Sequence, residues 1–240
     1  MATGSAGQIG HVRRVQWIAI AIAIVAAVCF VVTVLFGWGV IRFLPGHIAL
    51  TKSTHYMMRM SGCQALGEYR NHPQVDHIAE VLEGCLDDES DVVRVSAVGS
   101  LEQLDHRSST GVLLARVDDS SRFVSMRVRD TLARWQVPEL QKLLLDRLNA
   151  ASASDDDLVD AGRLLGYYHT PEAFQALKRV LGHKDDLVAG CAITGLSEYD
   201  TPEAWQLIEK SAKRDDLVGQ SARRAIEERN RGGDDSAGGR

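Results

Sequence analysis

A repeating unit of about 30 residues constrains the fold of this chain more than any other feature of its sequence. Residues 185–188 and 215–218 both read Asp-Asp-Leu-Val, and a Thr-Pro-Glu-Ala segment precedes each of them. Alignment on the valine finds further copies at intervals of 29 to 35 residues. We call the aligned residues anchors; they are Met58, Val93, Val124, Val159, Val188 and Val218. Copies of this length predict stacked helical hairpins, because a lone hairpin cannot bury its apolar face.

Each anchor begins a similar spacing of apolar and small residues. The anchor is followed four positions later by a small residue and eight positions later by an apolar one, as in Val93, Ala97 and Leu101. Positions i, i+4 and i+8 share one helix face, so the spacing predicts a packing seam on the second helix of each hairpin. The third copy has Val128 at the small position, and the copy at Val159 breaks the pattern. We interpret that break as a register shift of one residue.

The expected helix starts carry residues that favour them. Thr170 and Thr201 are expected N-caps, each followed by a proline at the first helical position, where its missing N–H costs no hydrogen bond. Four of the five prolines fall at expected starts of first helices: Pro73, Pro138, Pro171 and Pro202. No stretch shows sustained strand alternation, so the body is predicted to be all-α.

The residues Asp91, Val93, Arg94, Ala97 and Leu101 carry a resemblance to a known family. Their spacing resembles the second helix of HEAT repeats, particularly the short bacterial kind also found in phycobilin-lyase-like proteins. The resemblance covers about residues 55–229. It implies a right-handed solenoid whose second helices line a concave face, and it implies a binding scaffold.

The N-terminal part differs in composition from this body. No Asp or Glu precedes Glu68, so residues 1–67 carry five basic side chains, whereas the remainder carries 22 basic (27 − 5) and 32 acidic ones. No side chain from Trp17 to Ile41 is charged, and a helix of that length would cover about 37 Å, enough to cross a bilayer. We therefore expect an all-α protein with one transmembrane helix and about six HEAT-like hairpins. The expected segments are a basic tail over 1–16, the transmembrane helix over 17–44, a juxtamembrane linker over 45–54, the solenoid over 55–230 and a disordered tail over 231–240.

Side chains around the expected span suggest roles in a membrane. Tryptophan and arginine at its ends would mark the lipid interface, and alanines spaced by four would let a second helix approach closely. For the alanines, the alternative is an alanine-rich composition with no role in helix packing. The interface residues are Trp17, Trp38 and Arg42, and the packing residues are Ala19, Ala23 and Ala27. This predicts a single-pass protein of a bacterial inner membrane, in contact with lipid and able to form homo-oligomers through its span. The side of the solenoid stays open, with a slight preference for the extracytoplasmic side.

The sequence contains no recognisable catalytic or cofactor motif. It has no HExxH, CxxC or GxSxG segment and no glycine-rich phosphate loop. The His-Glu pairs by which proteins resembling deoxyhypusine hydroxylase bind iron are absent as well. Residues 155–157 are three aspartates, which fit helix capping or a cation site, and Cys63 and Cys85 fit either a disulfide or two buried thiols. We expect no enzyme activity, cofactor or metal, and the net charge of −5 argues against nucleic acid.

Two sets of side chains on the second helices suggest a partner-binding face. Apolar residues off the seam would suit a partner helix, or would pack against the neighbouring repeat. Arginines in the second and third repeats would bind an acidic partner or lipid headgroups, or form a solvated face. The candidate face comprises Met60, Arg94, Val95, Val98, Met126, Arg127, Arg129, Arg134, Tyr167, Tyr168 and Ile193.

These observations together predict a non-enzymatic, membrane-anchored scaffold or accessory subunit of a membrane protein complex, whose solenoid binds or braces a partner. The alternative is a lyase-like or enzyme-assisting HEAT protein that acts on a tetrapyrrole-bearing or membrane protein. That alternative requires a pocket of polar and aromatic groups around Tyr167 and Tyr168.

Overall fold

The computed structural model describes residues 43–150 and 153–237, with side chains described through residue 231, and every regular element in these ranges is helical. Each anchor lies in its own second helix: α2 (Tyr56–Gly67), α4 (Asp91–Leu104), α6 (Arg122–Arg134), α8 (Asp155–Leu164), α10 (Asp186–Ser197) and α12 (Leu217–Ala237). The first helices are a helix over residues 43–50, α3 (Val75–Gly84), α5 (Thr110–Leu114), α7 (Pro138–Asn149), α9 (Pro171–Leu181) and α11 (Pro202–Ser211). Short 3₁₀ helices η1 (Cys85–Asp87), η2 (Arg107–Ser109) and η3 (Leu165–Tyr168) lie between them. The predicted all-α repeat solenoid is confirmed.

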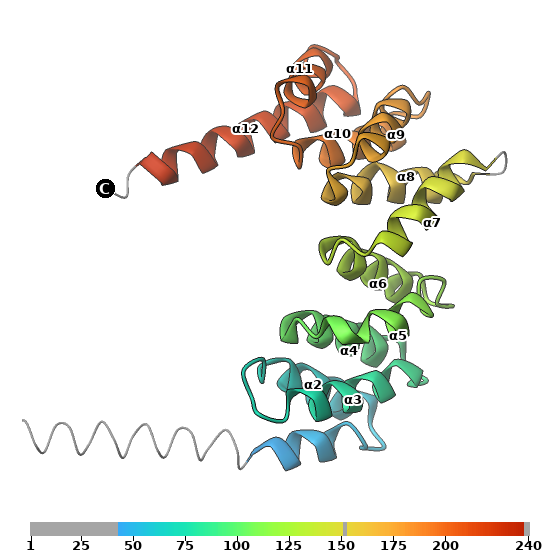
Figure 1. The fold of residues 1–240 in the computed structure, drawn as a ribbon, viewed down its shortest axis with the longest axis vertical. Coiled ribbons are helices and arrows are strands. Elements are labelled where there is room, and N and C mark those ends of the chain that lie inside the picture. Colours follow the sequence, from blue (N-terminus) through green and yellow to red (C-terminus); the bar gives the residue numbers. More distant parts are fainter. Residues whose placement is uncertain (1–42, 151–152, 238–240) are drawn as a thin grey trace, which may run out of the picture.

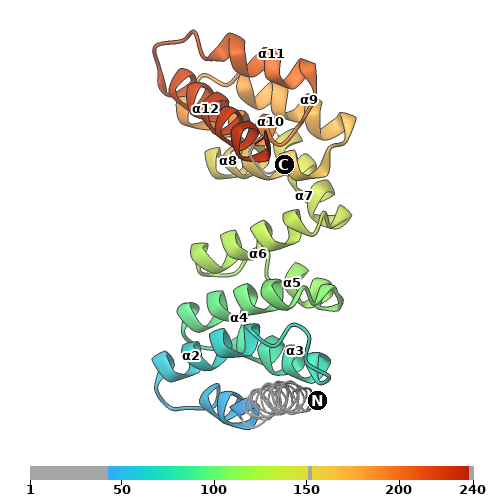
Figure 2. The ribbon, with the colours of Figure 1, turned by 90° about the vertical axis from the view of Figure 1, so that its left-hand side faces the viewer.

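The hairpins stack in chain order into an arc (Figure 1). Helix α4 packs between α2 and α6, and α10 packs between α8 and α12. Figure 2 shows α2, α4, α6 and α8 along one side of the stack and α3, α5, α7 and α9 along the other. The contact between α6 and α8 is much smaller than that between the other neighbouring second helices, so the stack is loosest at its middle.

The predicted seams form the core of most repeats. Val93, Ala97 and Leu101 are fully buried, and the corresponding residues of α10 are buried as well. The anchor of the first copy is an exception, since Met58 is 52% exposed while Leu66, eight positions later, is fully buried.

The fourth copy is shifted by one residue, as the broken pattern suggested. Gly162 and Gly166, rather than Arg163 and Tyr167, face the seam against α10. A Cβ on Gly162 would lie 3.0 Å from the backbone nitrogen of Ala192, and one on Gly166 would collide with the backbone of Gly195. Only glycine allows two helix backbones to approach this closely.

The helix starts form as their residues predict. The Thr170 hydroxyl accepts a hydrogen bond from the Ala173 backbone N–H (3.2 Å), and Thr201 caps α11 in the same way. Ser154 caps α8 and receives a reciprocal contact from Asp157, which forms a capping box. Of the two interpretations of the three aspartates, helix capping is thus the one that the geometry supports.

The structure corrects the predicted membrane anchor. No helix within residues 43–150 and 153–237 combines the length and the apolarity needed to cross a bilayer. Among the described residues the longest helix is α12, which has 21 residues and carries Arg223, Arg224 and Glu227. Leu44, at the end of the expected span, is only 4% exposed and lies in the solenoid core. The fold class that the described residues support is therefore an all-α solenoid, and neither the expected transmembrane helix over 17–44 nor the single-pass inner-membrane location is supported. Residues 1–42, including Trp17, Ala19, Ala23, Ala27, Trp38 and Arg42, lie outside the described ranges.

Two predicted boundaries also change. Residues 45–54 are not a linker, because residues 43–50 form a helix that packs on α2; a Cβ on Gly62 would lie 2.8 Å from the backbone nitrogen of Thr51. This helix begins at Phe43, before the predicted linker, and serves as the first helix of the first hairpin. At the other end, α12 continues to Ala237, so the predicted disordered tail over 231–240 is helical through residue 237.

Candidate binding face

The apolar part of the predicted face is divided between core and surface. Val98 and Ile193 are buried in the core, so these two residues are not available to a partner. Met60 and Val95 are half-buried and pack against the core, and Met126 lines a cleft between α6 and α8. The burial of these residues differs because part of the off-seam side of each second helix also packs against the next repeat.

The four predicted arginines are engaged within the solenoid. Arg94 pairs with Asp119 (Nη2–Oδ1, 2.8 Å), and Arg129 pairs with Asp160. Arg127 and Arg134 both pair with a single carboxylate, that of Glu102. The arginines therefore form ion pairs between neighbouring repeats, and they do not form the free basic patch that an acidic partner or lipid headgroups would require.

Neither Tyr167 nor Tyr168 lines the cleft between α6 and α8. Both pack against the core, and the Tyr168 hydroxyl donates a hydrogen bond to the Val137 carbonyl (3.0 Å). Burial raises the pKa of Tyr168, and its phenol stays neutral. In the irregular fourth repeat, both tyrosines are thus in packing contacts.

Sequence reasoning missed a row of exposed apolar side chains on the second helices. They are the residues directly before the anchors, and they are 43% to 71% exposed: Met57, Val92, Phe123, Leu187 and Leu217. The signal was present, because the residue before every anchor is apolar. In the shifted fourth copy the corresponding position is Asp157. Leu187 and Leu217 also line a groove of about 330 Å³ between α10 and α12.

Two junctions between repeats share one arrangement of an arginine. Arg59 and Arg94 each directly follow an anchor, and each binds the aspartate five residues before the next anchor: Arg59 binds Asp88 (Nε–Oδ2, 2.6 Å), and Arg94 binds Asp119. The guanidinium of Arg59 lowers the pKa of Asp88. Burial opposes ionisation of Asp119, but hydrogen bonds from Arg94 and the Ser121 backbone outweigh it and lower the pKa. These pairs hold successive repeats together away from water.

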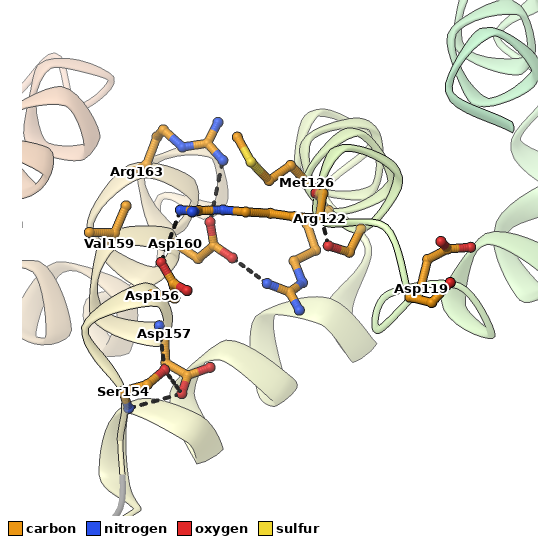
Figure 3. Close-up of a pocket in the computed structure, with 12 residues that line it drawn as sticks. Asp119, Arg122, Met126, Ser154, Asp156, Asp157, Val159, Asp160 and Arg163 are labelled. Atoms are coloured by element: carbon orange, nitrogen blue, oxygen red, sulfur yellow. Dashed lines mark hydrogen bonds and ion pairs between the residues drawn. The ribbon is translucent and has the colours of Figure 1, made fainter. Parts of the chain in front are cut away.

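The third junction lacks this arginine and contains a cleft instead. Ser125 stands in α6 at the position of Arg59 and Arg94, and it lines an opening of about 400 Å³ between α6 and α8. Figure 3 shows Arg122 reaching across this opening to Asp156 (3.0 Å), with Met126 and Val159 on its two walls. Arg163 pairs with Asp130 (2.6 Å) at the rim. The cleft is lined by three arginines and four aspartates: Arg122, Arg129, Arg163, Asp119, Asp156, Asp157 and Asp160.

The described residues offer no metal centre and no disulfide. No group of three or more histidine, cysteine or acidic side chains in this part of the chain is placed to hold an ion. Cys63 and Cys85 are buried free thiols, so of the two alternatives the thiols are present. A hydrogen bond between them lowers the pKa of Cys85 and raises that of Cys63.

Comparisons with known proteins agree with a HEAT-like solenoid. A family model described as HEAT repeats matches residues 143–227, from α7 into α12. None of the curated proteins matches this chain. The repeated hairpins define the class of the protein as an α-solenoid, and residues 143–227 are similar to HEAT repeats.

The solved structures that match this chain do so at low sequence identity. An engineered protein has 18% identity and a TM-score of 0.46, over 77% of this chain and 95% of its own. A designed armadillo repeat protein has 18% identity and a TM-score of 0.41, over 77% and 98%. Human deoxyhypusine hydroxylase in complex with glycerol has 18% identity and a TM-score of 0.37, over 78% and 73%.

Proposed function

We propose that this protein is a non-enzymatic binding scaffold, an accessory subunit of a larger protein assembly, and that its partner binds the second-helix face. The observation that carries this proposal is the row of exposed apolar residues at one repeated position. Single exposed apolar residues are ordinary on protein surfaces, but a row that recurs from repeat to repeat marks an interaction site. Phe123, at 71% exposure, is the most exposed of them.

The surroundings of the row support contact with a protein partner. Leu187 and Leu217 flank the groove between α10 and α12, a concave apolar surface into which a partner's side chains can insert. The charged groups nearby are largely engaged with one another, so apolar burial would supply most of the binding free energy. No observation favours the lyase-like alternative, since Tyr167 and Tyr168 are engaged in packing.

Site-specific photo-crosslinking in the native host tests this proposal. A photoreactive amino acid replaces Phe123 or Leu187 in the full-length protein, and in the control it replaces Val112, an exposed apolar residue of α5 on the first-helix side. We expect discrete adducts of defined mass from the two second-helix positions and none from Val112. Equal labelling from both sides, or no adduct from Phe123 and Leu187, would contradict the proposed face.

A further inference from the structure

The first two junctions show how this chain holds a guanidinium between repeats. Besides its carboxylate, Arg94 donates through Nη1 to the carbonyls of Asp88 (2.8 Å) and Glu89 (3.4 Å). Arg59 donates through Nη1 to the carbonyls of Ser53 and Thr54, both at 3.1 Å. In each junction the two carbonyls lie five and four residues before the anchor of the same repeat. Carbonyls at the same two repeat positions thus accept hydrogen bonds from an arginine guanidinium in both junctions.

The third junction has carbonyls at the same two positions, but no arginine follows its anchor to donate hydrogen bonds to them. Five and four residues before Val124 stand Asp119 and Ser120, and both line the cleft together with Ser125. Among the described residues, no side chain donates to the carbonyl oxygens of Asp119 or Ser120. Ser125 is too short to reach them, and its hydroxyl donates to the Arg122 carbonyl instead (3.0 Å).

Carboxylates are also within the cleft, on the side of α8. Asp156 is paired only with Arg122, and both side chains are 71% exposed, so this pair opens at little cost. Asp157 lies deeper, with one oxygen bound to Ser154 and the other 3.8 Å from Arg147. The three arginines that line the cleft point to carboxylates and leave the Asp119 and Ser120 carbonyls free.

We propose that the cleft between α6 and α8 receives the guanidinium of an arginine side chain from the partner protein, at the position that Arg59 and Arg94 occupy in the preceding junctions. Carbonyls of Asp119 and Ser120 accept from it, and Asp156 balances its charge. Met126 and Val159 contact the aliphatic stem, and the exposed Phe123 on the same helix contacts the partner beside it. A planar guanidinium with several fixed donors suits this acceptor set, whereas a lysine ammonium does not. The inference rests on the proposed function, because it names the chemistry of that partner.

Substitution of the serine tests the proposal directly. The Ser125→Arg variant supplies the missing guanidinium from the chain itself and should close the site. The probe is Nα-acetyl-arginine amide, with Nα-acetyl-lysine amide for comparison, and ligand-observed NMR on the full-length protein measures binding. We expect binding of the arginine probe to the native protein, about tenfold weaker binding of the lysine probe, and loss of arginine binding in Ser125→Arg. Ser96→Arg in α4 adds the same charge to the second-helix side away from the cleft and should leave binding unchanged.

Each other outcome overturns the inference. Equal binding of both probes would show that the cleft does not select a guanidinium, and retained binding in Ser125→Arg would place the probe elsewhere. If that variant does not fold, Asp156→Asn at an exposed position decides the matter, because this substitution removes the proposed counter-charge. Unchanged binding of the arginine probe to Asp156→Asn would refute the inference. If photo-crosslinking at Phe123 gives adducts but the arginine probe does not bind, the arginine site is refuted and the proposed binding face stands. If photo-crosslinking gives no adducts, the proposed binding face itself is refuted.

Discussion

Removal of the Arg94 guanidinium should destabilise the solenoid far more than removal of an exposed arginine. The Arg94 side chain is 11% exposed and that of Asp119 is 4% exposed, so Arg94→Met leaves a buried carboxylate without its counter-charge. Breaking a buried pair in this way costs about 3–5 kcal/mol. The Ser121 backbone N–H still donates to Asp119 (2.8 Å), so we expect the lower end, about 3 kcal/mol.

Urea unfolding at pH 7, followed by far-UV circular dichroism, measures this loss. The matched control is Arg122→Met, because both side chains of the Arg122–Asp156 pair are 71% exposed and the pair should contribute about 0–1 kcal/mol. Hydrogen exchange should show faster exchange in Arg94→Met at the junction of α4 and α6, since repeats contact only their neighbours. The double variant Arg94→Met/Asp119→Leu should recover much of the loss, because no buried charge remains. Equal destabilisation by Arg94→Met and Arg122→Met would refute the reasoning.

Three further predictions concern the same junctions and seams. The pKa values of Asp88, Asp118 and Asp119 are lowered in the folded state. The stabilisation by these carboxylates is therefore present above the ordinary aspartate pKa of 3.8 and is lost as pH falls through the lowered values. Thermal melts from pH 6 to 2.5 should show a falling melting temperature, and a constant melting temperature across that range would contradict the prediction. Gly195→Ala should lower the free energy of unfolding by about 1–3 kcal/mol, because the new Cβ would collide with the Gly162 carbonyl. The control is Gly111→Ala, since a Cβ at the exposed Gly111 meets nothing within 4 Å. Similar melting temperatures for the two variants would argue against the close approach of the helices. Thr170→Ala should cost about 1 kcal/mol through loss of the N-cap of α9, while Thr170→Ser should retain the cap; chemical denaturation distinguishes them, and equal loss in both would exclude capping as the cause.

The helical architecture was predictable because its determinants are local. The hydroxyl of Thr170 and the ring of Pro171 act within one turn, so the start of α9 follows from adjacent residues. The spacing of Val93, Ala97 and Leu101 places them on one helix face in any context. The expectation of a membrane-spanning helix rested on an apolar run without charged side chains. Of the two described residues at its end, Leu44 is buried in the solenoid core, whereas Phe43 is 64% exposed.

The candidate sites depended on contacts that adjacent residues cannot determine. Val98 and Met126 are both apolar and off the seam, yet Val98 is buried in the core and Met126 lines a cleft, because burial at each position depends on which neighbouring helix faces it. The pairs Arg94–Asp119 and Arg122–Asp156 join residues 25 and 34 positions apart, and no local spacing assigns these partners to each other.

The amino-acid sequence by itself thus determined the repeat, the number of its copies, the seam and most of the helix starts, since each arises from interactions within one or two helical turns. Only the tertiary structure decided which side chains face solvent, which arginines are paired and where the stack opens. Ser125 illustrates the difference: the sequence shows a serine where two repeats have arginine, but only the stacking of α6 on α8 makes that substitution a cleft. Exposure and charge pairing are properties of neighbouring repeats together, and a single repeat does not specify its neighbour.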